Sequence, residues 1–203
     1  MVNSQEAGTI SDREVVEQCR HGDPNAFGII VNRYKTRLYN VAMRYLGSRE
    51  DALDICQETF LRAYRSLESY RGDAQVYTWL YSIAANLARN RLRDGSRRGR
   101  DKGTSLDALQ ETAPAVADAA AASKRNPGTE AMEHEMEEVL QRCLDDLPEH
   151  YRLPFVLRTF DDLTYEEIAE VMNCPPGTVK SRLNQARKRL RQRLRELSIL
   201  EAE

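Results

Sequence analysis

The sequence predicts an all-α protein with two small helical domains joined by a flexible linker. Apolar residues recur at three- and four-residue spacing along most of the 203 residues, whereas the alternation typical of strands is nearly absent. Residues 95–130 interrupt this pattern with Gly, Ser, Pro and an alanine-rich tract, and they contain almost no large apolar side chains. Such a segment cannot bury enough surface to offset its ordering entropy. We therefore expect an N-terminal tail (1–11), a first domain (12–95), a linker (96–131) and a second domain (132–203).

Four helices are expected in the first domain. Ser11 and Glu14 form the capping-box pattern that starts a helix, and the His-Gly-Asp-Pro sequence at 21–24 ends it. Gly47 and Ser48 separate the next two helices. The apolar spacing places the remaining helices over about 25–46, 49–67 and 76–93, with a loop over 69–73.

The second domain is expected to contain two helices followed by a helix-turn-helix. Thr164 and Glu167 form a capping box for a short helix, and small Ala169 permits a close crossing with the helix that follows. A Cys-Pro-Pro-Gly turn leads to that long helix, for which Thr178 is the expected cap. The four helices are expected over about 130–147, 151–160, 164–172 and 178–197.

Composition excludes several classes of protein. No stretch approaches the roughly 18 to 20 consecutive apolar residues that span a bilayer, and the N-terminus lacks the basic and apolar regions of a secretory signal. We therefore expect a cytoplasmic protein without membrane insertion. The four Cys and three His residues are far apart and show no metal-ligand spacing. Free thiols, no metal site and no cofactor are expected.

The charges are unevenly distributed along the chain. The 30 Lys and Arg and the 32 Asp and Glu residues give a net charge of −2, which by itself weighs against a nucleic-acid partner. Residues 89–102 nevertheless carry +5 and residues 180–195 carry +8, and acidic residues at 133–149 and on the third helix offset them. One basic run alone is often a solvated helix face, but one in each domain indicates contact with a phosphate backbone at two places.

The last helix combines an apolar face with a polar, basic one. Val179, Leu183 and Leu190 are among the residues that share the apolar face by three- and four-residue spacing. Side chains suited to base edges point the opposite way, with residues suited to phosphates beside them: Ser181, Asn184, Gln185 and Lys188, flanked by Lys180, Arg182 and Arg187. The alternative is an αα-hairpin with a hydrated outer face. The tight turn and the positive charge together favour DNA recognition.

The fourth helix carries an aromatic residue beside amide and guanidinium groups. Trp79, Asn86, Asn90 and Arg93 lie on one flank, with Arg89 nearby. Such groups can stack on unpaired bases and bond to their edges, as in proteins that bind single strands. Packing of Trp79 in the core or between domains is the alternative explanation.

The third helix presents polar residues that indicate a protein-docking face. Asp54, Gln57, Glu58 and Arg62 lie opposite its apolar stripe. No His, Gly-rich loop or nucleophile accompanies the acidic residues, so we expect neither a catalytic site nor an enzyme.

Four motifs in order resemble the extracytoplasmic-function (group IV, sigma-E-like) family of bacterial RNA polymerase sigma factors. They are Gly-Asp-Pro-Asn-Ala-Phe at 22–27, Glu-Asp-Ala-Leu-Asp-Ile-Cys-Gln-Glu-Thr-Phe at 50–60, Tyr-Arg-Gly-Asp at 70–73 followed by Tyr-Thr-Trp-Leu-Tyr-Ser-Ile-Ala-Ala-Asn at 77–86, and the helix-turn-helix. The resemblance covers about residues 12–95 and 133–195. Its specificity comes from the order and spacing of the motifs, because a helix-turn-helix alone occurs in many DNA-binding proteins.

The resemblance implies a promoter-specificity subunit of RNA polymerase. The first domain would be sigma region 2, which binds the β′ clamp coiled coil through Asp54, Gln57, Glu58 and Arg62 and reads the −10 element. The second domain would be region 4, which reads the −35 element and docks on the β flap. An anti-sigma factor is a further implied partner. The residues implied for the −10 element are Tyr70, Arg71, Asp73, Trp79, Asn86, Arg89, Asn90 and Arg93, and those for the −35 element are Thr178, Lys180, Ser181, Arg182, Asn184, Gln185, Arg187 and Lys188.

A different function remains open from the residues alone. A helix-turn-helix repressor or activator would bind duplex DNA without being a polymerase subunit, and its first domain would serve for dimerisation or sensing. Tight duplex binding by the free protein would favour that alternative.

Overall fold

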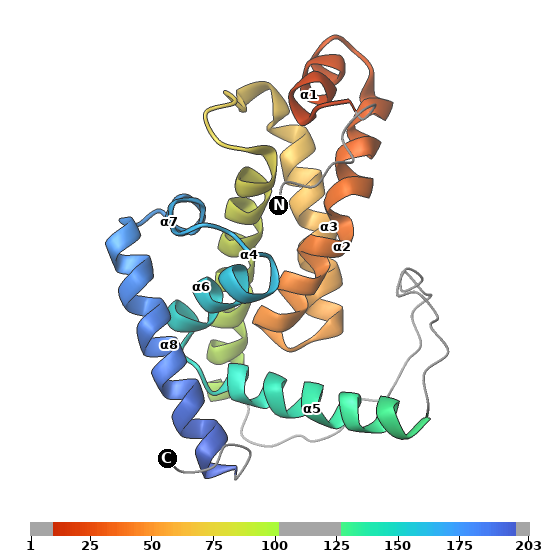
Figure 1. The fold of residues 1–203 in the computed structure, drawn as a ribbon. Helices are drawn as coiled ribbons and strands as arrows, with labels where there is room; N and C mark the ends of the chain where they lie inside the picture. Colours follow the sequence, from red (N-terminus) through yellow and green to blue (C-terminus); the bar gives the residue numbers. More distant parts are fainter. Residues whose placement is uncertain (1–9, 102–126, 198–203) are drawn as a thin grey trace.

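Eight α-helices and two short 3-10 turns make up the part of the chain that the structure, a computed structural model, describes: residues 10–101 and 127–197. Within these residues there is no strand, so the predicted all-α class is confirmed. The helices are α1 (Asp12–Arg20), α2 (Phe27–Leu46), α3 (Arg49–Arg65), α4 (Val76–Asp101), α5 (Pro127–Asp145), α6 (Glu149–Phe160), α7 (Tyr165–Met172) and α8 (Pro176–Glu196) (Figure 1). The 3-10 turns are η1 (Pro24–Ala26) before α2 and η2 (Leu67–Ser69) after α3.

Both predicted capping boxes are present. The backbone N–H of Glu14 donates to Ser11 Oγ at 3.3 Å, and the Ser11 N–H donates to the Glu14 carboxylate at 2.8 Å. The same reciprocal pair joins Thr164 and Glu167 at 3.2 and 2.7 Å. Each box satisfies two N–H groups that the first helical turn would otherwise leave unpaired.

The helices on either side of the predicted linker extend into it. α4 continues to Asp101 instead of ending near residue 93, and α5 begins at Pro127 instead of near residue 130. Arginine and leucine are good helix formers, and no proline follows α4 until Pro114, so the glycines at 95 and 99 do not end the helix. The centre of the predicted linker, 102–126, lies outside the described residues.

The predicted cap of the last helix is wrong. α8 begins at Pro176, and Pro175 is its N-cap, so Thr178 lies inside the first turn and does not cap the helix. Proline suits the first helical position because its fixed φ is helical and its missing N–H would be unpaired there in any case. The turn of the helix-turn-helix is correspondingly short, and Asn173 ends α7 in the left-handed conformation with a φ of 48°.

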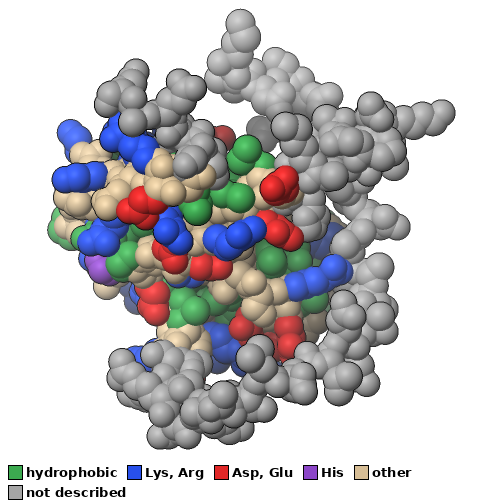
Figure 2. Space-filling view, turned by 90° about the horizontal axis from the view of Figure 1, so that it is seen from below, with side chains coloured by type: hydrophobic (Ala, Val, Ile, Leu, Met, Phe, Trp, Pro, Cys, Tyr) green, Lys and Arg blue, Asp and Glu red, His purple; other side chains and the backbone are tan. Residues whose placement is uncertain are grey.

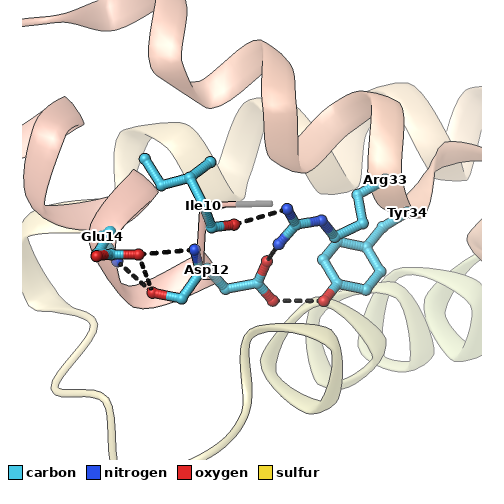
Figure 3. Close-up of polar contacts among 6 residues, drawn as sticks. Ile10, Asp12, Glu14, Arg33 and Tyr34 are labelled. Carbon is cyan, nitrogen blue, oxygen red and sulfur yellow. Dashed lines mark hydrogen bonds and ion pairs between the residues drawn. The ribbon is translucent and has the colours of Figure 1, made fainter. Parts of the chain in front are cut away.

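The beginning of α1 is fixed to α2 by polar contacts (Figure 3). Arg33 donates to the carbonyl of Ile10 at 2.9 Å and to the carboxylate of Asp12, which also accepts from the Tyr34 hydroxyl. Burial, together with the bond to Asp12, raises the pKa of Tyr34, so its hydroxyl stays protonated and remains a donor at neutral pH. Because Val15 and Val16 are also buried, α1 is held along its apolar face as well as at its start.

The N-terminal block (α1–α4) and the C-terminal block (α5–α8) pack on a shared apolar core. α6 lies against α2, and α7 lies against α4 (Figure 1). One buried cluster includes Leu38 and Tyr81 from the first block and Leu157 from the second. Local periodicity did not predict this packing, since it reports which face of a helix is apolar but not which distant helix covers that face.

Arg152 joins the end of α2 to the turn between α5 and α6. Its guanidinium, which is almost completely buried, donates to the carbonyls of Tyr45 at 2.9 Å, Asp145 at 2.6 Å and Leu147 at 3.1 Å. These carbonyls lie at or just beyond the end of a helix, where no intrahelical N–H group reaches them, so they would otherwise be unpaired. Gly47 closes α2 here with a φ of 72°, and a Cβ at that position would lie 3.1 Å from Asp145 Oδ1. The site therefore requires glycine for both its conformation and its closeness to α5.

Several further polar contacts cross between the blocks, among them those of Asp161 and Glu167. Arg37 Nε donates to Asp161 Oδ1 at 2.8 Å, and the Asp161 side chain is only 5% exposed. The Tyr77 hydroxyl donates to the Glu167 carboxylate. Burial would raise the pKa of Glu167, but the bonds from Tyr77 and Thr164 outweigh it and lower that pKa. Charged Glu167 therefore supports the packing of the two blocks at neutral pH.

Candidate nucleic-acid interface

The α4 face consists of Asn86, Arg89, Asn90 and Arg93. All are exposed except Arg89, which is half-buried. Arg89 donates to the amide oxygen of Asn86 at 3.3 Å, and Arg93 donates to that of Asn90 at 3.0 Å. Because the arginines occupy the amide oxygens, the amide nitrogens are the groups left to donate to a ligand. Asn86, Asn90 and Arg93, which were predicted on one flank together with Trp79, therefore lie close to Arg89, which was predicted nearby.

The loop between α3 and α4 carries the other residues predicted for the −10 element. Tyr70 stacks on Trp79 with ring centroids 4.7 Å apart, and its hydroxyl donates to the carbonyl of Ala74 across the loop. Arg71 and Asp73 are exposed beyond this stack. Trp79 is half-buried and also packs against the core of the N-terminal block. It therefore serves in core packing, which was the alternative explanation for this residue, and it also stacks under the loop.

A hollow between the end of α3 and α4 brings together residues from two predicted groups. It has a volume of about 410 Å³ and is lined by Arg62, Arg65, Ser66, Ile83 and Asn86. Arg62, predicted for core binding, thus borders the same space as Asn86, predicted for the −10 element. Arg65, Ser66 and Ile83 also line the hollow, but they were not among the predicted site residues. The spacing of three and four residues from Arg62 to Arg65 and Ser66 was the signal that could have placed them together.

The α3 face consists of Asp54, Gln57, Glu58 and Leu61. Asp54 and Gln57 are exposed, and Glu58 pairs with Arg62 at 2.6 Å. Leu61, which was not among the predicted residues, is 51% exposed and adds an apolar side chain to this face. A polar helix face with an exposed leucine at the same spacing resembles the partly apolar surface of a protein interface.

The outer face of α8 consists of Lys180, Ser181, Asn184, Gln185, Arg187 and Lys188, and all of these residues are exposed. Thr178 and Arg182, which were predicted with them, are half-buried. The guanidinium of Arg182 turns back toward the turn and lies 3.9 Å from Cys174 Sγ. Val179, Leu183 and Ala186 are buried as predicted, which fixes the outer face toward solvent.

One face of the molecule carries charges of both signs, in contrast to the basic outer face of α8. On the face seen in Figure 2, basic and acidic side chains alternate over short distances. The acidic α3 residues take part in this mixing, because Arg91 donates to Asp51 at 2.6 Å and lies 3.7 Å from Asp54. The bond to Asp51 raises the pKa of Arg91.

Neither a metal cluster nor a membrane span is found in the described ranges 10–101 and 127–197. No group of three or more His, Cys, Asp or Glu side chains there is placed to hold a metal ion. No helix within the same residues is long and apolar enough to cross a bilayer. Cys19, Cys56, Cys143 and Cys174 are free thiols, as the sequence predicted.

Comparison with known proteins identifies both blocks. Residues 30–98 match the model of Sigma-70 region 2, and residues 137–190 match that of Sigma-70 region 4. The chain is 38% identical over 188 residues to the ECF RNA polymerase sigma-E factor of Escherichia coli K12, covering 93% of this chain and 96% of that protein. It is 37% identical over 192 residues to the factor of the same name from Haemophilus influenzae, covering 94% and 99%.

Solved structures share the fold. The structure of CnrH in complex with the cytosolic domain of CnrY matches with a TM-score of 0.67 at 22% identity, over 92% of this chain and 99% of that one. The sigma factor RpoE of Bartonella quintana, solved with the anti-sigma factor NepR, matches with a TM-score of 0.63 at 22% identity, over 84% and 98%. Two region models in the right order and near-full-length relatives support a polymerase subunit over a free-standing repressor or activator. The chain therefore belongs to the extracytoplasmic-function sigma factors, and as such it binds RNA polymerase core and directs promoter-specific initiation of transcription.

Proposed function

We propose that the loop between α3 and α4, the α4 face and the adjoining hollow read the −10 element, and that the outer face of α8 reads the −35 element. The observation that carries this assignment is the hollow, where Asn86 lies beside Arg62 and Arg65. An amide donor beside two cations suits an unstacked base and the phosphates next to it. In the same scheme the outer face of α8 offers short polar groups for base edges, with cations beside them.

For the protein partners, the α3 face would dock on the β′ clamp coiled coil, and the C-terminal block on the β flap. Exposed Leu61 among polar residues supports the first contact. An anti-sigma factor is proposed as a regulator because RpoE of Bartonella quintana was solved with one. We further propose a non-enzymatic, cytoplasmic role, in which the chemistry of transcription belongs to the core enzyme.

Reconstituted transcription tests the assignment as a whole. Start sites mapped after overexpression of the chain supply the promoter, and core polymerase with the purified chain is then assayed on that template. Start-site-specific RNA that depends on both elements is expected. Transcripts that ignore substitutions in both elements would contradict the division of reading between the two blocks.

Asn86→Ala tests the hollow. Promoter melting and binding of the single-stranded −10 sequence by the holoenzyme should fall by roughly tenfold, because loss of one specific base contact costs about 1–3 kcal/mol. Core binding and −35 duplex binding should be unchanged. Asn40→Ala is the matched control, since Asn40 is an exposed amide on α2 outside the hollow. Equal losses in the two variants, or equal losses at both promoter elements, would refute the assignment.

Gln57→Ala combined with Glu58→Ala tests the α3 face. We expect core-polymerase affinity to weaken by roughly tenfold, as for loss of an interface residue worth about 1–2 kcal/mol. Glu17→Ala with Gln18→Ala is the control, because it removes the same two residue types from the exposed side of α1. Fluorescence anisotropy of labelled protein titrated with core enzyme measures both. Unchanged affinity in the α3 variant would contradict the docking site.

A further inference from the structure

The loop that we assign to the −10 element is held from outside by α1. Arg20, in the last turn of α1, donates from one guanidinium nitrogen to the carbonyl of Leu67 at 3.1 Å and to the carbonyl of Tyr70. Leu67 is the first residue of η2, and Tyr70 directly follows η2. Arg20 and Tyr70 are 50 residues apart in the sequence. Neither the capping box that begins α1 nor the Tyr-Arg-Gly-Asp motif at 70–73 indicated that these two residues are bonded.

The end of α1 is a firm support for this contact. Its beginning is bonded to α2 through Ile10 and Asp12 (Figure 3), and Val15 and Val16 are buried along its length. The helix therefore cannot shift without breaking contacts at both places. Arg20 is thus presented to the loop from a helix that is itself fixed to the N-terminal block.

The loop has few other restraints. Tyr70 stacks on Trp79 and closes the loop through its bond to Ala74, whereas Arg71 and Asp73 are exposed. Gly72 has a φ of 79° in the centre, a conformation that glycine adopts freely in the unbound chain as well. Backbone bonds from Ser69 to Ser66 and from Tyr70 to Leu67 hold the η2 turn itself, and Leu67 is buried. Without Arg20, the position of the loop would depend on these local contacts and on the Tyr70 side chain. Bonds from a charged donor to backbone carbonyls are among the stronger hydrogen bonds in proteins.

We propose that Arg20 is a positioning residue for promoter recognition, which fixes the loop between α3 and α4 in the shape that reads the −10 element. This inference rests on the proposed assignment of the loop. Arg20 acts through the carbonyls of Leu67 and Tyr70 and does not itself touch DNA. A preformed loop avoids the ordering cost that a mobile one meets on binding, so both affinity and discrimination between −10 sequences depend on it.

Hydrogen exchange tests the structural half of the inference in the full-length free protein. In Arg20→Ala, amides of residues 67–75 should exchange at least tenfold faster, while those within α1 keep their wild-type protection. Arg13→Ala is the matched control, because Arg13 is an exposed arginine of the same helix whose ion pair among the described residues is with Glu17, at 3.5 Å. Unchanged exchange in the loop of Arg20→Ala would overturn the inference.

Holoenzyme binding tests the functional half. On mapped promoter DNA and on versions with single substitutions in the −10 element, Arg20→Ala should reduce the preference for the native element by roughly tenfold and leave core affinity unchanged. The slope of log affinity against log salt should stay at its wild-type value. A slope lower by about one unit would show that Arg20 contacts a phosphate directly, and it would overturn the positioning role.

The remaining outcomes separate this inference from the proposed function. Faster loop exchange with unchanged −10 preference would make Arg20 a residue of fold stability only, which overturns the inference while Asn86→Ala still supports the assignment. A wild-type holoenzyme with no −10 preference would overturn the proposed function, and this inference with it.

Discussion

Alanine at both Arg187 and Lys188 is expected to lower promoter affinity by at least tenfold and to reduce the salt dependence of binding by about two units. Both side chains are exposed on the outer face of α8, three residues after Asn184 and Gln185 respectively. Each cation that neutralises a phosphate releases a counterion, so the slope of log affinity against log salt reports how many such contacts are lost. Titration of holoenzyme against promoter duplex at several salt concentrations measures both quantities.

The matched control removes the same charge further along the same helix. Arg191→Ala with Arg195→Ala changes two exposed arginines that lie closer to the end of α8. A recognition helix contacts DNA mainly through its beginning, so this control should alter the slope by less than one unit. If it has the same effect as the Arg187 and Lys188 variant, the loss reflects overall charge and not a phosphate contact.

The base-reading part of the same face should behave differently. Asn184→Ala with Gln185→Ala removes no charge, so the salt slope should stay constant while the preference for the native −35 sequence falls. Comparison of the two double variants therefore separates positioning on the backbone from sequence reading. A shared loss of slope would show that the outer face does not divide in this way.

Local features of the fold could be predicted from the sequence because they depend on neighbouring residues. The capping boxes at Ser11 and Thr164 and the buried face of α8 follow from spacing alone, and all are present. The extension of α4 to Asp101 was missed because glycine and composition suggested an end where arginine and leucine maintain the helix. Helix ends are decided by small differences in propensity, and composition reports those poorly.

Contacts between distant residues could not be predicted in the same way. Arg20 and Tyr70 are 50 residues apart, and Arg37 and Asp161 are 124 apart. Nothing in either local pattern marks an arginine as the partner of a particular carbonyl or carboxylate. The candidate site was affected similarly, because helical spacing placed Asn86 on a polar flank of α4 but gave no sign that it shares a hollow with Arg65.

The packing of the two blocks leaves the proposed DNA-reading faces open to solvent. The outer face of α8 is exposed while α6 and α7 are packed against α2 and α4. Those contacts hide apolar surface, including Leu38 and Leu157, that would meet water if the blocks separated. The polar groups around this surface add to that apolar attraction. Among the ion pairs that cross between the blocks in the described residues, Asp161 is the most deeply buried carboxylate.

Asp161→Lys is expected to separate the two blocks in the free protein. It replaces a carboxylate that is 5% exposed with a cation facing Arg37, and removal of one partner from a buried pair costs several kcal/mol. Because Arg37 is about half exposed, we expect the lower end of that range, about 3 kcal/mol, or roughly a hundredfold shift toward the separated form. Small-angle scattering should show a larger radius of gyration, and hydrogen exchange should show loss of protection where α6 contacts α2.

A charge exchange distinguishes this effect from local damage to the end of α6. Arg37→Asp combined with Asp161→Arg restores opposite charges across the same contact, so it should recover much of the compact form, whereas Arg37→Asp alone should open the protein. Arg33→Asp is unsuitable as a control because Arg33 holds α1. Lys35→Asp is the suitable control, because Lys35 is a neighbouring exposed cation of α2 whose bond among the described residues is to Asn32. It should leave the radius of gyration unchanged. An equally expanded form in the exchanged variant would show that the backbone around Asp161, and not its pairing with Arg37, holds the blocks together.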